Sequence, residues 1–524
     1  MEQTHFDLII IGGGATGSGI ALDATLRGLK TLIVEKNDFG EGTSSRSTKL
    51  VHGGVRYLEG AVKKLDSSQY NLVKEALKER YRLLKNASHL ASPITLVTPL
   101  YKWYEIPYMY IGLVLYDLIS GNRRLGTSKI VGKKEIMDIF PAVKKKNLKG
   151  GVRYYDGAFN DAKMIISLLQ SAKEKGCEVK NYTEVIDFLY EDTKLRGVRL
   201  FDKLKNIEYE LTSDCIINAT GVFSDQVRKL DDKNSKEMLK VSSGIHIVLD
   251  KKFLPNNEGI MIPKTEDGRV LFMLPYLGKC LVGTTDEESK VEEHPCVSND
   301  DIEYLLRHID KYFDVKVSKS DILSSWSGLR PLVINENVQS TKELVREHVI
   351  SKAESGLISI VGGKWTTYRK MAEEILDFSF KDKRNLQDCG TKEYKLVGNN
   401  KNIINIQEKL NGLNYNNKLV KHLISSYGDC SLDVVKYIEK FGTKKLHEEY
   451  PYVEAEVYYS IDHEFTCKPL DFLVRRIGLG FIDKKGAKEC LESTTEIFKD
   501  KFSWNEEEYT LHVKEAKNIL DKNL

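Results

Sequence analysis

Blocks of apolar residues alternate with polar ones along the chain in an order that predicts an α/β fold. Residues 6–11, FDLIII, are almost continuously apolar, which is typical of a strand buried on both faces of a parallel sheet. A glycine cluster follows, then small and apolar residues at helical spacing up to Gly28, and residues 31–35, TLIVE, predict a second strand. Strand, glycine turn, helix and strand in this order predict a doubly wound nucleotide-binding unit.

The same patterning divides the remainder of the chain into helical and extended segments. Apolar residues at helical spacing among charges predict helices, and β-branched runs predict strands. Residues 90–155 are irregular and aromatic, and the polar residues 380–400 predict a linker. The predicted helices cover residues 68–90, 161–175, 299–313, 365–376 and most of the chain after 401, and the predicted strands include residues 177–191, 214–220, parts of 241–345, and 356–363.

The glycine cluster has the spacing G-x-G-x-x-G, at Gly12, Gly14 and Gly17. The first glycine permits a tight turn, the second lets the backbone approach a pyrophosphate, and the third lets helix and strand pack closely. Backbone amides at the helix start favour the phosphate charge. Glu35 ends the second strand, where its carboxylate can accept hydrogen bonds from a ribose hydroxyl. The motif serves NAD and FAD alike, so it leaves the cofactor open between them.

Two later segments also end strands at glycines. Residues 219–221, ATG, offer a second close backbone approach, and residues 362–364, GGK, open a helix whose amides can face developing negative charge. A helix start aimed at the pyrimidine edge of a flavin favours the reduced form. Because the chain has no second G-x-G-x-x-G for a nicotinamide, we expect the electrons to leave by another carrier.

Composition narrows the function classes. The chain has 524 residues, with 79 basic and 76 acidic side chains, and this balance gives no support for nucleic-acid binding. The eight cysteines form no C-x-x-C pair, which excludes a zinc knuckle and a dithiol motif. Residues 462–464, DHE, have metal-ligand side chains, but three consecutive residues rarely converge on one ion, so we predict no metal site and expect a helix cap or a domain contact.

Seven blocks together resemble the FAD-dependent glycerol-3-phosphate dehydrogenases, of the glycine-oxidase-like flavoprotein fold. The most specific are HGGVRYLE and GGKWTTYRK. The resemblance covers nearly the whole chain and implies oxidation of sn-glycerol 3-phosphate to dihydroxyacetone phosphate by hydride transfer from C2 to N5 of FAD. The blocks run in the family's order: IIGGGATGSGIALDATLRGL, TSSRSTKLVHGGVRYLE, INATGVFSD, SSGIHIVLD, VGTTD, SGLRPL and IVGGKWTTYRKMAEEIL.

The family implies three domains in an α/β chain. These are a Rossmann-like FAD-binding domain in separate segments, an inserted α+β substrate-binding domain, and an all-α C-terminal domain. We predict the FAD-binding domain at residues 1–95, 156–240 and 346–380, the substrate-binding domain at 96–155 and 241–345, a linker at 381–400, and the helical domain at 401–524.

The resemblance also implies which residues bind the cofactor, including a segment that lies beneath the flavin ring. Gly53 and Gly54 are expected beneath the ring, where a Cβ would collide with it. The predicted cofactor-binding residues are Gly12, Gly14, Ala15, Thr16, Gly17, Glu35, Lys36, Thr43, Ser44, Ser45, Lys49, Gly53, Gly54, Ala219, Gly221, Gly363, Lys364 and Thr366.

A substrate that is a phosphate dianion and a secondary alcohol needs fixed cations and a base. For the base, His52 is the first choice and His246 the second, because histidine titrates near neutral pH. Asp286 is expected either to orient a cation or to cap a turn. The predicted catalytic residues are His52, Arg330, Lys364 and His246, and the predicted substrate-binding residues are Arg56, Tyr57, His246, Arg330, Arg346 and Lys364.

The family further implies electron transfer to ubiquinone or menaquinone at a membrane surface. The chain shows no transit segment and no calcium loop, so we expect a bacterial-type enzyme, peripheral on the cytoplasmic side of the inner membrane, and possibly a homodimer. A glycerol-3-phosphate oxidase that uses O2 stays open as an alternative, and so does a non-catalytic flavin-binding scaffold. The predicted membrane patch, which could equally form a buried helix, comprises Trp103, Tyr104, Tyr108, Met109, Tyr110 and Leu113–Leu115, with Arg123 and Arg124 just beyond.

Overall fold

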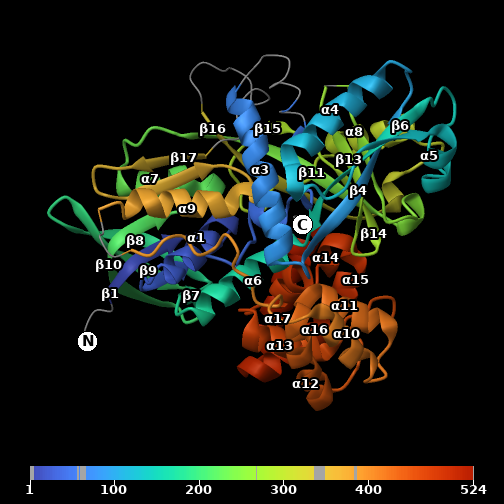
Figure 1. The fold of residues 1–524 in the computed structure, drawn as a ribbon. Helices are drawn as coiled ribbons and strands as arrows, with labels where there is room; N and C mark the ends of the chain where they lie inside the picture. Colours follow the sequence, from blue (N-terminus) through green and yellow to red (C-terminus); the bar gives the residue numbers. More distant parts are fainter. Residues whose placement is uncertain are drawn as a thin grey trace.

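The computed structural model describes residues 5–55, 58, 67–266, 268–334, 348–382 and 386–522. Three parts lie side by side (Figure 1). An α/β domain carries the N-terminus, a second sheet with its helices lies next to it, and the C-terminal helices pack beneath both. The predicted α/β class with an all-helical C-terminal domain is confirmed.

The α/β domain is built on a mainly parallel sheet. β1 (His5–Ile11) pairs in parallel with β10 (Ile207–Asn218) and with β2 (Thr31–Val34), β10 also pairs with β18 (Ile358–Gly362), and β2 with β7 (Glu178–Lys180). The β1 strand is buried along most of its length, as its apolar sequence predicts. The strand order is β17 (His348–Lys352), β18, β10, β1, β2 and β7. Outside this order, β9 (Lys194–Asp202) pairs with β10, and β8 (Thr183–Glu191) pairs with β9.

Helices cover this sheet and complete its core. Small residues let α1 (Ala15–Leu26) pack closely between its neighbours, and a Cβ added to Gly19 would lie 2.7 Å from the Tyr368 ring. The other helices of this domain are α6 (Asp161–Glu174), α7 (Ser224–Asp231) and α9 (Tyr368–Ser379).

The second sheet is mainly antiparallel. Its strand order is β15 (Glu287–Ser289), β11 (Leu239–Leu249), β14 (Lys279–Gly283), β13 (Leu271–Tyr276), β12 (Gly259–Ile262), β4 (Ala91–Leu100), β6 (Gly150–Phe159) and β3 (Leu50–Val51), while β16 (Ile322–Val333) also pairs with β11 and β5 (Lys129–Gly132) with β6. The associated helices are α3 (Ser67–Asn86), α4 (Glu105–Ser120), α5 (Lys133–Ile139) and α8 (Asn299–Tyr312).

The structure revises the sequence description between residues 90 and 159. The segment expected to be irregular contains two long paired strands, β4 and β6, and the helix α4. The predicted domain boundaries at 95/96 and 155/156 fall inside β4 and β6. These strands are hydrogen-bonded to each other along their whole length, so residues 91–100 and 150–159 lie together in the second sheet.

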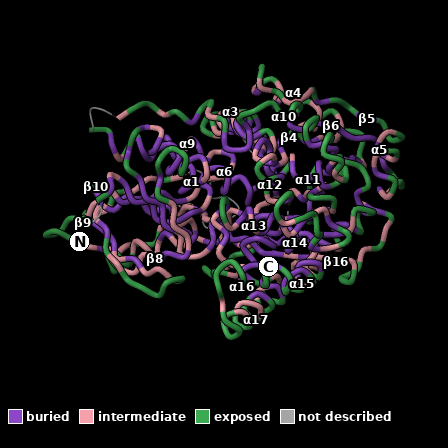
Figure 2. The backbone as a smooth tube through the Cα atoms, turned by 90° about the horizontal axis from the view of Figure 1, so that it is seen from below, coloured by how far each residue is buried: buried purple, intermediate pink, exposed green. Residues whose placement is uncertain are grey.

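The C-terminal part consists of short helices joined by tight turns. Its last helix, α17 (Glu506–Lys522), is largely exposed at the edge of the molecule (Figure 2), whereas the strands β1 and β2 at the centre of the first sheet are buried. Its elements are α10 (Ile403–Asn411), α11 (Asn417–Tyr427), α12 (Ser431–Phe441), α13 (Glu454–His463), a π-helix (Asp471–Arg476), α14 (Leu479–Ile482), α15 (Lys484–Glu489), α16 (Leu491–Phe502) and α17.

Candidate active site

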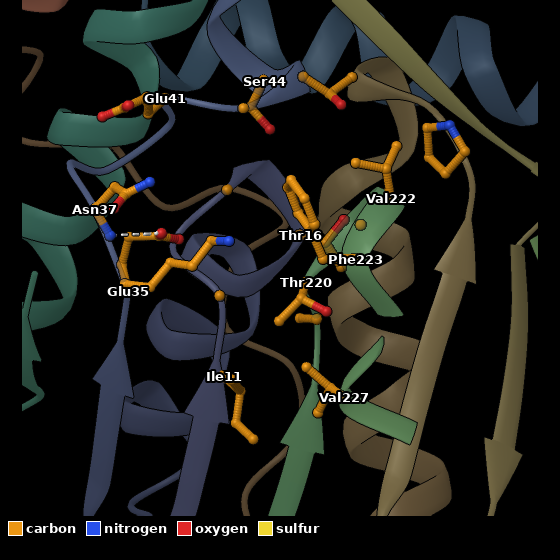
Figure 3. Close-up of a pocket in the computed structure, with 18 of the residues that line it drawn as sticks. Ile11, Thr16, Glu35, Asn37, Glu41, Ser44, Thr220, Val222, Phe223 and Val227 are labelled. Carbon is orange, nitrogen blue, oxygen red and sulfur yellow. Dashed lines mark hydrogen bonds between the residues drawn. The ribbon is translucent and has the colours of Figure 1, made fainter. Parts of the chain in front are cut away.

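A cavity of about 510 Å³ opens where the parallel strands of the first sheet end. The carboxyl ends of β1, β2, β10 and β18 meet at one edge, which is where open α/β sheets bind ligands. Thr16, Glu35, Ser44 and Thr220 surround this space (Figure 3). Of the predicted cofactor-binding residues, those that line the cavity are Gly12, Gly14, Ala15, Thr16, Glu35, Lys36, Thr43, Ser44, Ala219, Gly221, Gly363 and Lys364.

The glycine motif has the geometry that a dinucleotide requires. Gly12 has a φ of +105°, and a Cβ there would lie 2.8 Å from the Ala219 carbonyl oxygen. A Cβ at Gly17 would lie 1.9 Å from the Gly12 carbonyl oxygen, so Gly17 serves helix packing and does not line the cavity. Gly14 caps α1 without a side-chain hydrogen bond, and the first turn of α1 carries no acidic residue. The helix start therefore presents backbone amides to an anion.

Glu35 closes one end of the cavity. Its two carboxylate oxygens accept hydrogen bonds from the amides of Gly13, at 2.8 Å, and Asn37, at 3.1 Å (Figure 3). Burial raises the pKa of Glu35, and these two hydrogen bonds oppose the shift. Lys36, beside it, forms an ion pair with Glu293 and lies over the Phe223 ring, 4.2 Å from its centroid.

The segment after Gly42 connects the cavity to the second sheet. Thr43 Oγ1 donates to the Leu329 carbonyl at 2.6 Å, and Trp365 Nε1 donates to the Ser44 carbonyl at 2.8 Å. Ser45 faces a second cavity of about 190 Å³. Thr366 Oγ1 donates to the His52 carbonyl at 3.4 Å, which holds the strand-ending glycine turn against the loop that carries His52.

The structure shows that Gly53, which was expected beneath a flavin ring, packs against side chains of two helices. A Cβ at this position would lie 2.6 Å from Leu77 and 2.8 Å from the Tyr116 hydroxyl oxygen. The Gly53 amide also donates to that hydroxyl at 2.6 Å. Packing against α3 and α4 therefore disfavours a larger residue here, and the contact with a flavin ring stays a prediction. Gly54 has a φ of +82°, which favours glycine.

Lys49 does not line the cofactor cavity. Its ammonium is paired with Asp161 at 2.6 Å and donates to the Ser45 carbonyl at 2.6 Å. The rings of Tyr276, Trp326 and Phe481 surround it, with centroids 5.3, 5.4 and 4.6 Å away. Burial lowers its pKa, and Asp161 partly offsets that effect. The Lys49 side chain thus links the α/β domain, through Asp161, to the second sheet, through Tyr276 and Trp326.

His246 and Arg330 lie on the neighbouring strands β11 and β16. His246 Nε2 is hydrogen-bonded to Thr48 Oγ1 at 3.0 Å, and its ring stacks on Trp326 with centroids 5.3 Å apart. Within the described chain, Nδ1 is buried without a hydrogen-bond partner. Burial, with the charges of Arg330 and Lys49, holds the pKa of His246 well below its usual value. The imidazole is therefore neutral at neutral pH.

Arg330 is held at the guanidinium by several oxygens. Nη2 donates to Thr284 Oγ1 at 2.9 Å and to the Thr285 carbonyl at 3.0 Å, and Nη1 lies 3.3 Å from Asp286. Asp286 therefore orients a cation, one of the two roles expected for it. Gly244 makes room for Arg330, since a Cβ there would lie 2.1 Å from Nη2.

The remaining predicted residues divide into two groups. His52 is half-buried and Lys364 lines the cofactor cavity. Arg56, Tyr57 and Arg346 lie outside the described residues. In the described ranges no cluster of metal-ligating side chains occurs. The side chains of the DHE segment diverge, because Asp462 binds Lys501 whereas Glu464 forms a buried ion pair with Lys163 of α6.

Sequence reasoning missed several residues that support the site. Thr48 and Trp326 contact His246, and Asp161 pairs with Lys49. Trp326 precedes Arg330 by four residues in a strand, so alternation places both on one face, and this signal was readable. The Asp161 pairing spans 112 residues and had no local signal.

Comparisons with known proteins agree with this geometry. Residues 7–369 match the family described as FAD dependent oxidoreductase, and residues 389–509 match the C-terminal domain of alpha-glycerophosphate oxidase. The mitochondrial glycerol-3-phosphate dehydrogenases of Mesocricetus auratus and Homo sapiens are 41% and 40% identical to this chain, over 96% and 99% of it and 72% and 74% of their own lengths.

Solved structures give the same result. The glycerol-3-phosphate dehydrogenase from Bacillus halodurans, complexed with FAD, has a TM-score of 0.81 and 31% identity, covering 99% of this chain and 95% of that one. The L-alpha-glycerophosphate oxidase from Mycoplasma pneumoniae has a TM-score of 0.56 at 18% identity, covering 72% of this chain and 95% of that one, and shares the fold.

The parallel sheet, its glycine motif and the cavity at the strand ends define an FAD dependent oxidoreductase. The cofactor of this class is FAD, as expected, and the amides of α1, the glycine at 12 and the carboxylate of Glu35 fit a dinucleotide. Within the class, the chain belongs to the FAD-dependent glycerol-3-phosphate dehydrogenases, which confirms the resemblance.

Over the part of the chain that the structure describes, we find no helix with the length and hydropathy needed to cross a bilayer. The mammalian relatives named above are mitochondrial and give no support to the expected bacterial inner membrane.

Proposed function

We propose that the protein oxidises sn-glycerol 3-phosphate to dihydroxyacetone phosphate and passes the electrons to a membrane quinone. One observation supports the placement of the chemistry: β16 brings Arg330 next to Pro331, which lines the cofactor cavity, and the Leu329 carbonyl accepts a hydrogen bond from Thr43 of the same cavity. The backbone on either side of Arg330 thus contacts the proposed FAD site, and the Arg330 guanidinium is a cation suited to phosphate. FAD, when bound, supplies a two-electron acceptor for the hydride from C2.

The proposed phosphate site uses cations that the fold holds in place. Arg330 is fixed by Thr284 and Asp286, so little side-chain entropy is lost when it binds an anion. Lys364 follows the glycines at the end of β18 and lines the same cavity. We assign phosphate binding to Arg330, Lys364, Arg56 and Arg346, and a contact with the substrate to Tyr57.

The substrate hydroxyl must lose its proton as the hydride leaves, and His52 and His246 are the two proposed bases. A base must be neutral to accept the proton; burial keeps His246 neutral at neutral pH, and the same lowering of its pKa makes it a weaker base. Trp326 and Thr48 fix the ring, and the buried Nδ1 has no partner within the described chain. His52 lies on the loop held by Thr366 beside the cofactor cavity.

The proposed electron route ends at a lipid surface reached by α4 and the turn before it. Trp103, Tyr104, Tyr108, Ile111 and Leu118 are exposed by 74, 53, 53, 60 and 68%, an apolar surface of the kind that enters a bilayer interface.

The opposite side of the helix corrects the predicted patch. Leu113 and Tyr116 are buried in the protein, so α4 is half interior and half surface. Leu113 therefore does not belong to the membrane patch.

The acceptor is tested by reoxidation. The holoenzyme is reduced anaerobically with glycerol 3-phosphate and then mixed with a soluble ubiquinone analogue or with air-saturated buffer. We expect reoxidation by quinone to be at least tenfold faster than by O2, with little peroxide. Faster reoxidation by O2 with stoichiometric peroxide would support the oxidase alternative. No reduction by substrate would support the flavin-binding scaffold.

A further inference from the structure

The loop of residues 35–42, which we call the cofactor loop, faces two ways. Six of its residues line the cofactor cavity, namely Glu35, Lys36, Asn37, Gly40, Glu41 and Gly42. Asp38 and Phe39 do not line it, and both are buried against other parts of the protein. The loop therefore has an inner side toward the ligand and an anchored side away from it.

Asp38 is anchored by the C-terminal helical domain. Arg476 donates to both oxygens of this carboxylate, from Nη1 at 2.7 Å and from Nη2 at 2.8 Å, and Arg475 Nε donates to Oδ2. Asp38 and Arg476 are both fully buried. A two-pronged contact between arginine and carboxylate fixes orientation as well as distance. It joins the start of the chain to a π-helix more than 400 residues later.

Phe39 continues the same contact into the glycine motif. Its ring meets Phe465 edge to face, with centroids 5.6 Å apart. On its other side it covers Gly13, where an added Cβ would lie 2.3 Å from the ring. The Gly40 amide also donates to the Gly13 carbonyl at 3.1 Å. Through Phe39, the helical domain thus contacts the glycine turn whose backbone amides face the cofactor cavity.

A third link supports the loop from below. Asp471 of the π-helix accepts a hydrogen bond from the Tyr182 hydroxyl at 2.7 Å, and the Tyr182 amide donates to the Asn37 carbonyl at 3.0 Å. Arg475 Nη2 also donates to Asp471 at 2.9 Å. The two arginines and two carboxylates form one buried cluster, in which burial favours the protonated form of Asp38 but Arg476 and Arg475 keep its pKa low.

We propose that Asp38, Arg475 and Arg476 are positioning residues through which the C-terminal helical domain holds the cofactor loop in the shape that binds FAD. This inference rests on the proposed placement of FAD in the cavity beside the glycine motif. Removing one partner leaves the buried cluster with fewer hydrogen bonds and an unbalanced charge, so the anchored side of the loop moves and the inner side loses its alignment.

A matched pair of substitutions separates cofactor positioning from general stability. Arg476→Met and Lys163→Met each replace a buried cation by an apolar side chain of similar length. Lys163 also joins the helical domain to the α/β domain, through a buried ion pair with Glu464, but it lies on α6 and does not line the cofactor cavity. Both variants should lower the melting temperature.

The readout is the rate at which the purified holoenzyme releases flavin, followed by flavin fluorescence. We expect Arg476→Met and the isosteric Asp38→Asn to release FAD at least tenfold faster, and Lys163→Met to stay within twofold of the unmodified protein. Equal acceleration in Arg476→Met and Lys163→Met, or no acceleration in Arg476→Met, would overturn the proposal. If Arg476→Met does not fold, the rate of FAD release from Asp38→Asn, compared with that from Lys163→Met, tests the proposal in its place.

One further variant checks the placement of FAD itself. Thr16 lines the cavity at the start of α1, and Thr16→Trp fills part of that space. We expect it to lower the FAD content of the purified protein. A Thr16→Trp protein with full flavin would refute the placement, whereas normal release from Arg476→Met alone would refute only the anchoring role.

Discussion

The role of Arg330 can be tested by adding one carbon atom next to it. A Cβ at Gly244 would lie 2.1 Å from Nη2, 2.5 Å from Nη1 and 2.6 Å from Cζ of Arg330. Gly244 lies inside β11 with no positive φ, so alanine fits the backbone there. In Gly244→Ala the guanidinium must withdraw by roughly 1.3 to 1.9 Å, since ordinary van der Waals contact begins at 3.4–4 Å. Because the guanidinium is the end of a flexible side chain, the backbone should keep its fold, although stability falls with the hydrogen bonds that are broken.

The expected loss follows from what the guanidinium holds. Its withdrawal breaks the hydrogen bonds to Thr284 Oγ1 at 2.9 Å and the Thr285 carbonyl at 3.0 Å, and it misaligns the donors for phosphate. A hydrogen bond to a charged group contributes about 1.5–3 kcal/mol. Losing one such bond weakens substrate binding roughly 10- to 150-fold, since about 1.4 kcal/mol corresponds to a factor of ten.

The assay is anaerobic stopped-flow reduction of the flavin over a range of glycerol 3-phosphate concentrations. We expect the half-saturating concentration to rise by that factor, with unchanged FAD content. Gly132→Ala is the control, because a Cβ at Gly132 meets no atom within 4 Å. Unchanged half-saturation in Gly244→Ala, with the same flavin content, would refute the assignment of phosphate binding to Arg330.

Three further predictions follow. One of the two variants His52→Asn and His246→Asn, the one that removes the base, should slow flavin reduction in stopped flow by about 10²- to 10⁴-fold. If neither variant slows flavin reduction to that extent, neither histidine is the base. Burial lowers the pKa of His89 to about 3, so as pH falls below the ordinary value of 6.5 the unfolded chain is protonated at His89 before the folded one, and the free energy of unfolding falls by roughly 2 kcal/mol by pH 5. His89→Asn should therefore flatten the dependence of the urea unfolding free energy on pH between 6.5 and 5. An unchanged slope would contradict this. Tyr108→Glu and Ile111→Glu should release the protein from anionic vesicles in sedimentation while dye-linked activity persists, and retained binding would exclude α4 as the contact.

The nucleotide site was predictable because its signals are local. Gly12, Gly17 and Glu35 stand at fixed distances around one strand–helix–strand unit, and each spacing has a steric or hydrogen-bonding reason. The strand ends at Ala219 and Gly363 could be recognised in the same way. Parallel strands bring their carboxyl ends to one edge, so these segments had to converge there.

The supports of the site were not predictable in this way. Lys49 meets Asp161, and Asp38 meets Arg476, across separations that no periodicity reports. Gly53 was assigned to a ligand contact, whereas Leu77 and Tyr116 of two other helices already fill the space beside it. The helix α4 was ambiguous because its apolar residues lie on both a buried and an exposed face.

The central claim is that a bound flavin faces a cationic pocket that recognises a phosphorylated secondary alcohol. Anaerobic titration of the purified yellow holoenzyme, followed at the flavin absorbance, tests it most directly. We predict full bleaching with one equivalent of sn-glycerol 3-phosphate per flavin and none with the same amount of glycerol, which lacks the phosphate. Persistent colour after glycerol 3-phosphate, or equal bleaching by glycerol, would contradict the account.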